Sequence, residues 1–464
     1  MNWREYLKGK KITIIGLGLN GGALNDAKFL SKHGAVLTVT DIKTAEQLAP
    51  SVEALKDFPN IKFVLGEHHL EDFQTADLVL QPGNVPLNSP YFEEARKNNI
   101  PIFVSESLFA YLAPEVELVG VTGTRGKSTV TQLIYEILKL DYERGLNRAT
   151  CGAVGQNGSS RKPFLGGNVR NVSTLALLEE VAAGDLVVME LDSWALRGLG
   201  DIKKSPNLAV FTNLLIDHLN FYKGSMELYL HDKAQIFIHQ MEQDTVVLGQ
   251  QVEATIKEKY GDQIKSKIIV AEPDLPVEWQ INLPGAHNRY NVSLAVTATR
   301  ELGVSEEKIK EAVENFQGLP GRLEYLGEKD GITYYNDNNA TTPDGTIAAV
   351  KAFPNFKGKI ILIGGGADKE LDFTEYGQIV PDYVKKFILF EGPATEKIIS
   401  AIDAYPRGLA SWVRVDSMAV AFSEAQNVAE TGDMILLSPA AASFGVFRNE
   451  YERNDQFVSL VKNI

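Results

Sequence analysis

The chain has 464 residues, and 46 Lys and Arg against 60 Asp and Glu give it a formal net charge of −14. At about 150 residues per domain this length predicts about three domains, and the acidic balance disfavours partners such as nucleic acid or an anionic membrane. The single cysteine, Cys151, excludes an internal disulfide, so we expect a reducing compartment.

The N-terminal segment MNWREYLKGKK is charged and lacks the apolar core of a secretory signal. No run of the sequence approaches the roughly 20 apolar residues that a bilayer-spanning helix needs. We therefore expect a cytoplasmic protein, working as a monomer, without integral membrane contact.

Short β-branched runs, each followed by a Gly-rich turn or a helical pattern, dominate the chain. Such runs predict buried parallel strands joined by right-handed βαβ units. The fold class we expect is α/β, with a Rossmann-like N-terminal domain, a P-loop central domain and a Rossmann-like C-terminal domain. The predicted strands lie in 11–18, 36–41, 117–123, 186–191, 208–213, 359–366 and 434–439.

Two breaks divide these units. Pro114 precedes the second series of strands, and the Gly/Pro turn within 314–325 precedes a new strand. The predicted domains are therefore residues 1–114, 115–318 and 319–464.

The first glycine-rich turn reads G-x-G-x-x-G and follows the strand that begins at Lys11. Gly16, Gly18 and Gly21 can bring the backbone close to a pyrophosphate, and Asp41 ends the next strand. Strand, turn, helix and distal acid together predict a nucleotide or nucleotide-sugar site. The motif alone does not distinguish NAD from another diphosphate ligand, and a tight turn without a ligand is the alternative.

A second glycine-rich turn, VTGTRGKST at 121–129, also connects a strand to a helix. Gly123 and Gly126 allow successive N–H groups to face phosphate oxygens. Lys127 supplies a positive charge for the β- and γ-phosphates, and the hydroxyl of Ser128 or Thr129 suits Mg²⁺. This shorter variant of the Walker pattern predicts an ATP-type ligand.

Eleven motifs in order along nearly the whole chain resemble the Mur ligase family, which joins amino acids to a UDP-sugar carboxylate in peptidoglycan precursor synthesis. The resemblance is to its glutamate-adding branch, and implies an ATP-dependent ligase that adds D-glutamate to UDP-N-acetylmuramoyl-L-alanine through an acyl phosphate. The motifs are IIGLGLNG, QPGNVP, GVTGTRGKST, GGNVR, MELDSW, TNLLIDHLNFY with HDKAQIF, GAHNRYN, LPGRLE, NDNNATT, GGADKELDF and LLSPAAASFGVFRNEYERNDQF.

The resemblance also implies a magnesium site. Glu190 and His218 fall on the family's metal-ligand positions, Lys233 matches its carbamylated lysine, and Ser128 belongs to the same set. A carbamate is an anion with two oxygens, so it could hold Mg²⁺ where an ammonium would repel it. The catalytic set implied is Lys127, Glu190, His218 and Lys233.

Three further groups of contacts follow from the resemblance. Several of them fall on different predicted domains, so we expect domain closure during catalysis. The residues implied for ATP are 123–129 (Gly123, Thr124, Arg125, Gly126, Lys127, Ser128, Thr129), Asn288, Asn291, Arg322 and Asp337; those for the UDP-substrate are Gly16, Gly18, Asn20, Gly21, Asp41 and Asn168; and those for glutamate are Thr341, Lys369 and Ser443.

Departures from the family pattern concentrate on the amino-acid side. Asn339 stands where S-K-A-T-N places a lysine, and Thr342-Pro343 replaces the rest of that motif. Glu450 replaces an aromatic residue, and Asp192 replaces a serine near Glu190. These changes bear on the identity of the amino acid more than on the type of reaction.

Three alternatives therefore stay open. One is the same chemistry with L-glutamate, because a related ligase carries an A-T-T-P-like stretch. Another is a catalytically silent UDP-sugar-binding homologue, which the retained Lys127 and Lys233 argue against. The third is an NAD-dependent oxidoreductase, which would leave the second phosphate loop unexplained.

Overall fold

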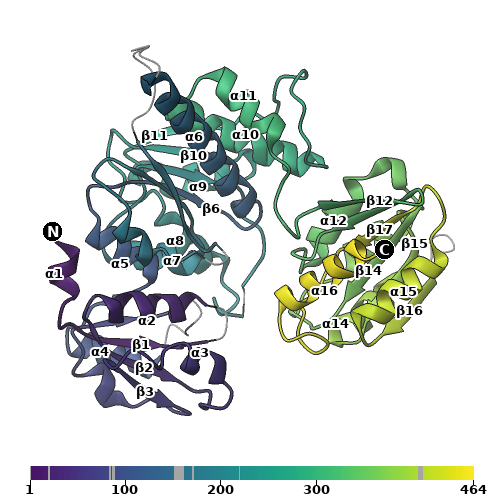
Figure 1. The fold of residues 1–464 in the computed structure, drawn as a ribbon. Coiled ribbons are helices and arrows are strands. Elements are labelled where there is room, and N and C mark those ends of the chain that lie inside the picture. Colours follow the sequence, from purple (N-terminus) through teal and green to yellow (C-terminus); the bar gives the residue numbers. More distant parts are fainter. Residues whose placement is uncertain are drawn as a thin grey trace. The chain divides into compact units, whose positions relative to one another are not determined.

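A computed structural model describes residues 2–18, 21–82, 85, 89–150, 161–169, 172–218, 220–405 and 411–464, with the side chains of 146–150 left out. Cys151 and Asn20 therefore lie outside the described residues. The chain forms two compact units. One comprises 1–275 and 291–313, and the other comprises 276–290 and 314–464. Three sheets run through them, two in the first unit and one in the second (Figure 1).

The first sheet is fully parallel with strand order β3-β2-β1-β4-β5. The order reverses beside β1, so the loop after β1 opens at a topological switch point, where such sheets bind ligands. The elements are α1 (Trp3–Leu7), β1 (Lys11–Ile15), α2 (Gly22–Lys32), β2 (Val36–Asp41), α3 (Ala49–Glu53), β3 (Ile61–Leu65), the 3₁₀ turn Leu70–Phe73, β4 (Leu78–Leu80), α4 (Pro90–Lys97), β5 (Ile102–Phe103) and α5 (Ser105–Leu112).

The second sheet is also parallel, with order β11-β10-β9-β6-β8-β7. Its central strand β6 leads into the phosphate loop. The elements are β6 (Glu117–Thr122), α6 (Lys127–Thr150), β7 (Pro163–Gly167), the 3₁₀ turn Leu175–Glu179, β8 (Leu186–Glu190), α7 (Ser193–Asp201), β9 (Leu208–Phe211), α8 (Met226–Ala234), β10 (Thr245–Leu248), α9 (Gln250–Tyr260), the 3₁₀ turn Gly261–Gln263, β11 (Lys267–Val270), α10 (Ala286–Glu301) and α11 (Glu306–Asn315).

The third sheet has the order β12-β13-β17-β14-β15-β16, in which only the β12–β13 pair is antiparallel. That hairpin precedes the strand at 359–366 from which the sequence predicted the sheet to begin. The elements are β12 (Glu324–Lys329), β13 (Ile332–Asn336), α12 (Pro343–Lys351), the 3₁₀ turn Pro354–Phe356, β14 (Ile360–Gly365), α13 (Thr374–Ile379), the 3₁₀ turn Val380–Asp382, β15 (Val384–Phe390), α14 (Pro393–Ala404), β16 (Ser411–Val415), α15 (Met418–Val428), β17 (Met434–Leu437) and α16 (Glu450–Lys462).

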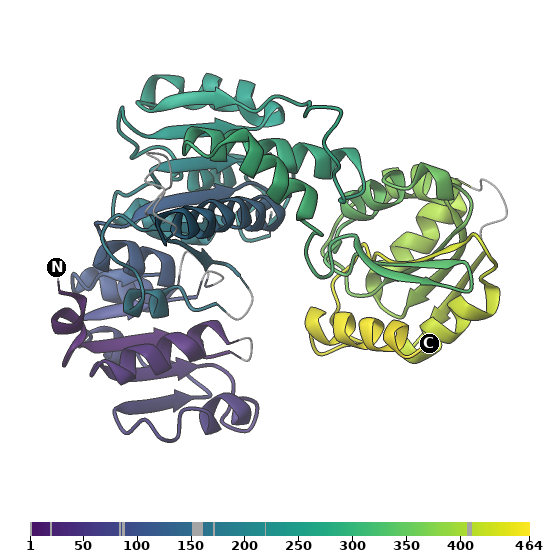
Figure 2. The ribbon, with the colours of Figure 1, turned by 45° about the horizontal axis from the view of Figure 1, so that its top comes forward.

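The cores explain why three sheets form two units. One continuous apolar cluster joins side chains of the first and second sheets, including Leu30 of α2, Leu108 of α5 and Leu196 of α7. Figure 2 shows the first sheet and its helices beside the second sheet within this unit. In the third sheet, α12, α13 and α14 cover one face, and α15 and α16 cover the other. Within the described residues, no helix is long and apolar enough to cross a membrane.

A buried carboxyl lies where these first two layers meet. Asp26 of α2 is 4% exposed and accepts hydrogen bonds from the hydroxyls of Ser105 and Ser173. Burial raises the pKa of Asp26 from 3.8 to about 6, although both hydrogen bonds oppose the rise. Between pH 3.8 and about 6, Asp26 keeps its proton in the folded chain but releases it in the unfolded chain. The free energy of unfolding therefore falls as pH rises through this range.

Asp26→Asn should remove this pH dependence. At about pH 8 the variant should be more stable than the parent by roughly 1–2 kcal/mol, and near pH 4 the two should converge. Urea unfolding across the range measures the difference. The control Asp57→Asn changes an exposed carboxyl and should leave the profile unaltered. A stability difference for Asp26→Asn that is constant with pH would contradict the prediction.

Candidate active site

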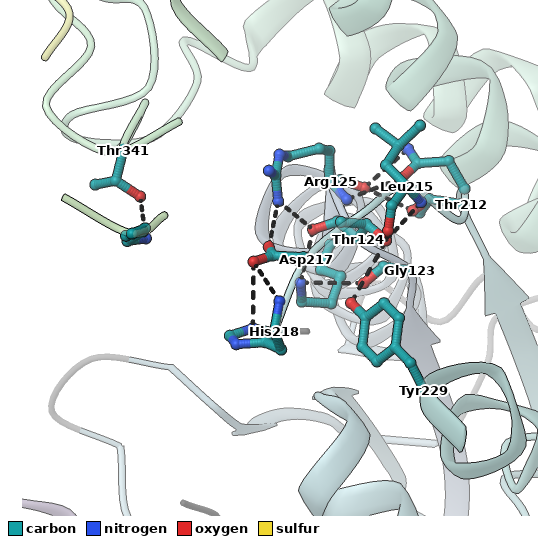
Figure 3. A network of polar contacts seen from close by, with 12 residues as sticks. Gly123, Thr124, Arg125, Thr212, Leu215, Asp217, His218, Tyr229 and Thr341 are labelled. Carbon is teal, nitrogen blue, oxygen red and sulfur yellow. Dashed lines mark hydrogen bonds and ion pairs between the residues drawn. The ribbon is translucent and has the colours of Figure 1, made fainter. Parts of the chain in front are cut away.

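The phosphate loop is held by the strand beside it. Gly123 and Gly126 have φ of +141° and +82°, a region that favours glycine. A Cβ on Gly123 would lie 1.9 Å from the Thr212 hydroxyl. Thr212 follows β9 and donates to the Arg125 carbonyl at 2.6 Å, while the Thr124 N–H donates to the Asn213 carbonyl at 2.9 Å (Figure 3). The loop is thus preformed by its neighbours rather than by its own sequence alone.

Two lysines converge on this loop. Lys127 Nζ donates to the carbonyls of Gly123 and Thr124, each at 3.2 Å. Lys233 of α8 is 1% exposed, and its Nζ donates to the same Gly123 carbonyl at 2.7 Å. Burial, and then the charge of Lys127, lower the pKa of Lys233 well below its ordinary value. Two residues 106 positions apart in sequence therefore share one acceptor, and Lys233 is favoured as a neutral amine.

Glu190 lies at the carboxyl end of β8, beside β6 in the register Val121↔Glu190. It is 5% exposed. The neighbouring strand approaches closely, since a Cβ on Gly167 would lie 2.2 Å from the Glu190 carbonyl oxygen. The exposed Asn168 donates its N–H to that oxygen at 2.9 Å. The geometry therefore brings Asn168, a candidate for the UDP-substrate, next to a candidate metal ligand.

His218 has a left-handed backbone, with φ of +53°. Its side chain is 41% exposed and packs edge-on against Trp194, with ring centroids 5.0 Å apart. His218 is thus partly exposed rather than buried in the core, so its role as a metal ligand stays a prediction. Asp217 forms a 2.7 Å ion pair with Arg125 (Figure 3). It stands within IDHLNFY, but the sequence alone did not indicate this contact. Only the fold brings it to the phosphate loop.

The donors suit magnesium only if Lys233 changes its chemistry. Among the described residues, no group of three or more His, Cys, Asp and Glu side chains is placed to hold a metal ion. Glu190 supplies a carboxylate and His218 an imidazole, and Ser128 stands in the first turn of α6 at the loop. A carbamate on Lys233 would add the further anionic oxygens that Mg²⁺ prefers, and the lowered pKa of Lys233 favours the neutral amine that carbamate formation requires.

Of the two asparagines of α10, Asn291 reaches the phosphate loop. A Cβ on Gly126 would lie 2.3 Å from the Asn291 side-chain oxygen. Asn288 donates its side-chain amide to the Pro284 carbonyl at 2.9 Å. That bond is a local cap-like contact, so the ATP role expected for Asn288 stays a prediction.

The first glycine loop is braced by the acid expected to bind a ligand. Asp41 is 6% exposed, and its two carboxylate oxygens accept the N–H groups of Gly18 at 3.2 Å and Lys43 at 2.9 Å. Gly16, Gly18 and Gly21 all have positive φ, of 80°, 60° and 89°. Asp41 therefore shapes the loop, and each oxygen keeps a lone pair for a ligand.

In the second unit, Asp337 follows β13 and lies close enough to Arg322 for their charges to interact. It is 8% exposed and accepts hydrogen bonds from the Ser438 hydroxyl at 2.9 Å and the Leu323 N–H at 3.2 Å. Burial raises the pKa of Asp337 to about 7, while these bonds and Arg322 oppose the rise. The fold thus pairs two residues expected to contact ATP.

The three glutamate candidates come from three loops at one edge of the third sheet. Lys369 is exposed and donates to the Thr341 hydroxyl at 2.9 Å. Ser443 is 4% exposed, and its hydroxyl has no hydrogen-bond partner among the residues that the structure describes. A buried hydroxyl without a partner costs free energy unless a ligand supplies one. The loops are joined where the Ala367 N–H donates to the Ala442 carbonyl at 3.0 Å.

The structure explains two of the departures locally, those at Asp192 and Pro343. Asp192 caps α7, accepting the N–H groups of Trp194 at 3.0 Å and Ala195 at 2.8 Å, and aspartate serves this position as well as serine does. Pro343 stands in the first turn of α12, where a missing N–H costs little. Asn339 donates its N–H to the Gly321 carbonyl at 3.0 Å but restores no cation.

Three domain families match successive parts of the chain. They are the Mur ligase MurD-like N-terminal domain over residues 10–104, the Mur ligase middle domain over residues 121–271, and the Mur ligase glutamate ligase domain over residues 321–441. Each match contains one of the three sheets or most of it.

Two similar proteins span the whole chain. The UDP-N-acetylmuramoylalanine--D-glutamate ligase of Roseiflexus sp. (strain RS-1) is 34% identical, over 98% of this chain and 99% of its own length. The protein of the same name from Borreliella burgdorferi (strain ZS7) is 33% identical, over 99% of both chains.

Solved structures share the fold at lower identity. UDP-N-acetylmuramate-alanine ligase MurC from Thermotoga maritima superposes with a TM-score of 0.61 at 19% identity, over 98% of this chain and 99% of that one. MurF ligase from Thermotoga maritima, in complex with ADP, gives a TM-score of 0.59 at 16% identity with the same coverage.

Proposed function

The chain belongs to the Mur ligase family, and from this membership we propose that it is the ATP-dependent ligase that joins D-glutamate to UDP-N-acetylmuramoyl-L-alanine. The observation that carries the proposal is the match to ligases of this name over the whole chain, together with a phosphate loop on which Lys127 and Lys233 converge. The product is a precursor of peptidoglycan, so the enzyme serves cell-wall synthesis, and with it cell shape and division.

The chemistry needs placed charges rather than a protein nucleophile. The substrate carboxylate attacks the γ-phosphorus of ATP, giving an acyl phosphate and ADP. The neutral amine of glutamate then adds to the acyl carbon, the bond from that carbon to the phosphate oxygen breaks, and one amine proton leaves with the phosphate, giving the amide and inorganic phosphate. Both steps gather negative charge, so their rates depend on preorganised donors. Backbone N–H groups of 123–129 and the ammonium of Lys127 supply these donors to the phosphates.

Magnesium would be held by Ser128, Glu190, His218 and a carbamate on Lys233. When bound, it neutralises charge on the phosphoryl group that is transferred. To form the carbamate, the neutral Lys233 amine would attack carbon dioxide and lose a proton, which would turn a buried amine into an anion. The Lys127 ammonium then has a carbamate as its neighbour instead of a second amine.

Glutamate is a dianion with an amine that must be neutral to attack. Lys369 supplies a cation to one carboxylate, and the hydroxyls of Thr341 and Ser443 donate to the carboxylate oxygens. The buried Ser443 hydroxyl lacks a partner among the described residues, which supports this assignment.

The enzyme acts as a cytoplasmic monomer, and the first glycine loop holds the UDP group.

Phosphate release from ATP tests the function directly. With UDP-N-acetylmuramoyl-L-alanine, we expect release with D-glutamate at least about 100-fold faster than with L-glutamate, because a site built for polar groups rejects a misplaced one strongly. D-aspartate and D-alanine serve as matched controls for chain length and for the second carboxylate. Phosphate release with L-glutamate but not with D-glutamate would overturn the stereochemical assignment. Absence of release with every amino acid tested would favour a silent homologue.

A further inference from the structure

The third sheet carries a fully buried cation that none of the roles above uses. Arg453 of α16 is 0% exposed, and burying a guanidinium is costly unless its donors are satisfied. Its Nε donates to the Asn338 side-chain oxygen at 2.7 Å, its Nη2 to the Asn338 carbonyl at 3.0 Å, and its Nη1 to the Ala441 carbonyl at 3.2 Å. All three acceptors are neutral oxygens of two loops.

Those two loops carry glutamate candidates. The first follows β13 and holds Asn338 three residues before Thr341, and the second follows β17 and holds Ala441 two residues before Ser443. The strands β13 and β17 are parallel neighbours, so the loops leave one sheet edge side by side. The planar fork of one arginine therefore spans both loops and fixes their separation.

Hydrogen bonds hold both the side chain and the backbone of Asn338 in place. Its side-chain amide donates to the Glu450 carbonyl at 3.0 Å, and its backbone N–H donates to the Asn336 side-chain oxygen at 3.1 Å. The charge of Glu450, on the same helix, acts favourably on the Arg453 guanidinium. Burial lowers the pKa of Arg453 to about 10, so the group stays charged at neutral pH.

We propose that Arg453 is a positioning residue for the amino-acid substrate, which holds the Asn338–Thr341 and Ala441–Ser443 loops at the separation that glutamate requires. Arg453 touches neither ATP nor the UDP-sugar in this assignment, so its loss should weaken glutamate binding selectively. The inference rests on the proposed function, because that function supplies the glutamate that the loops bind.

The test compares steady-state constants of the full-length protein. In Arg453→Gln the KM for D-glutamate should rise about 10–100-fold, the range seen when a partner that orients a ligand-binding group is lost. The KM values for ATP and the UDP-substrate should stay within about twofold. Arg453→Lys keeps the charge without the fork, and should show nearly the same rise.

The matched control is Phe457→Leu, one turn along the same helix, where a fully buried ring packs in the core against Phe422 of α15. This variant should lower the thermal midpoint without raising the KM for glutamate more than about twofold. If Arg453→Gln does not accumulate as folded protein, Asn338→Ala decides, with an expected rise of about fivefold because it removes the Nε acceptor.

A parent-like KM for glutamate in folded Arg453→Gln or Asn338→Ala would overturn the inference alone. A KM for glutamate in Arg453→Lys equal to the parent's would also overturn it, because charge alone would then explain the effect. So would an equal rise of the KM values for glutamate, ATP and the UDP-substrate in both Arg453→Gln and Phe457→Leu. A parent protein that releases no phosphate with any amino acid would overturn the proposed function and this inference together.

Discussion

Lys127→Ala is expected to lower kcat by about 10³-fold or more, with binding of the UDP-substrate retained. Lys127 is the cation at the head of α6, and its ammonium donates to two carbonyls of the phosphate loop, each at 3.2 Å. In the proposed reaction, phosphate oxygens of ATP would replace these carbonyls as acceptors, and the interaction would strengthen as charge develops on the γ-phosphoryl group. A preorganised donor of this kind is worth two to three orders of magnitude or more.

Phosphate release measures kcat, and calorimetric titration measures binding of the UDP-substrate. Lys257→Ala, which removes an exposed lysine of α9 that pairs with Glu253 on its own helix surface, should keep the parent's activity. Activity of Lys127→Ala within a few-fold of the parent would show that 121–129 is not the ATP loop. Loss of UDP-substrate binding as well would point to unfolding instead, which circular dichroism detects.

Lys233→Ala should reduce kcat about 10²–10³-fold, and added acetate or formate should restore part of the loss. The lysine is 1% exposed and points at the Gly123 carbonyl over 2.7 Å, so its removal opens a small pocket beside the phosphate loop. If the working group is a carbamate, a short carboxylate placed in that pocket supplies the missing anion.

Three comparisons make the rescue specific. Sodium chloride at equal ionic strength should not restore activity, and neither should acetate added to Lys127→Ala. In the parent, isotope-labelled bicarbonate should give a carbamate signal in carbon NMR that Lys233→Ala lacks. Failure of every carboxylate to rescue, with no carbamate signal in the parent, would show that Lys233 acts as an unmodified amine.

The sequence predicted the local frame of the site well. Each of the seven predicted strand regions contains an observed strand, and both glycine loops follow their strands as expected. These features depend on contiguous residues, because a run of β-branched side chains ending in glycine specifies a buried strand and a tight turn without reference to distant partners. The three-sheet α/β fold class is confirmed in the same way.

Some features that the sequence did not show depend on contacts between distant segments. Asp217 was overlooked because its partner Arg125 lies 92 residues earlier. Asp41 was expected only as a ligand group, yet it also fastens the loop at Gly18. The sequence also did not show that the charge of Glu450 acts on the buried Arg453 guanidinium.

The sequence by itself determined the reaction class, because phosphate loops and ordered family motifs are local patterns that need no fold to be read. The tertiary structure decided which lysines share the Gly123 carbonyl and which loops a buried arginine joins. Parallel strands far apart in sequence end at one sheet edge, so side chains 100 or more positions apart become neighbours there. The register of those strands, which no single segment encodes, sets the distances on which binding and catalysis depend.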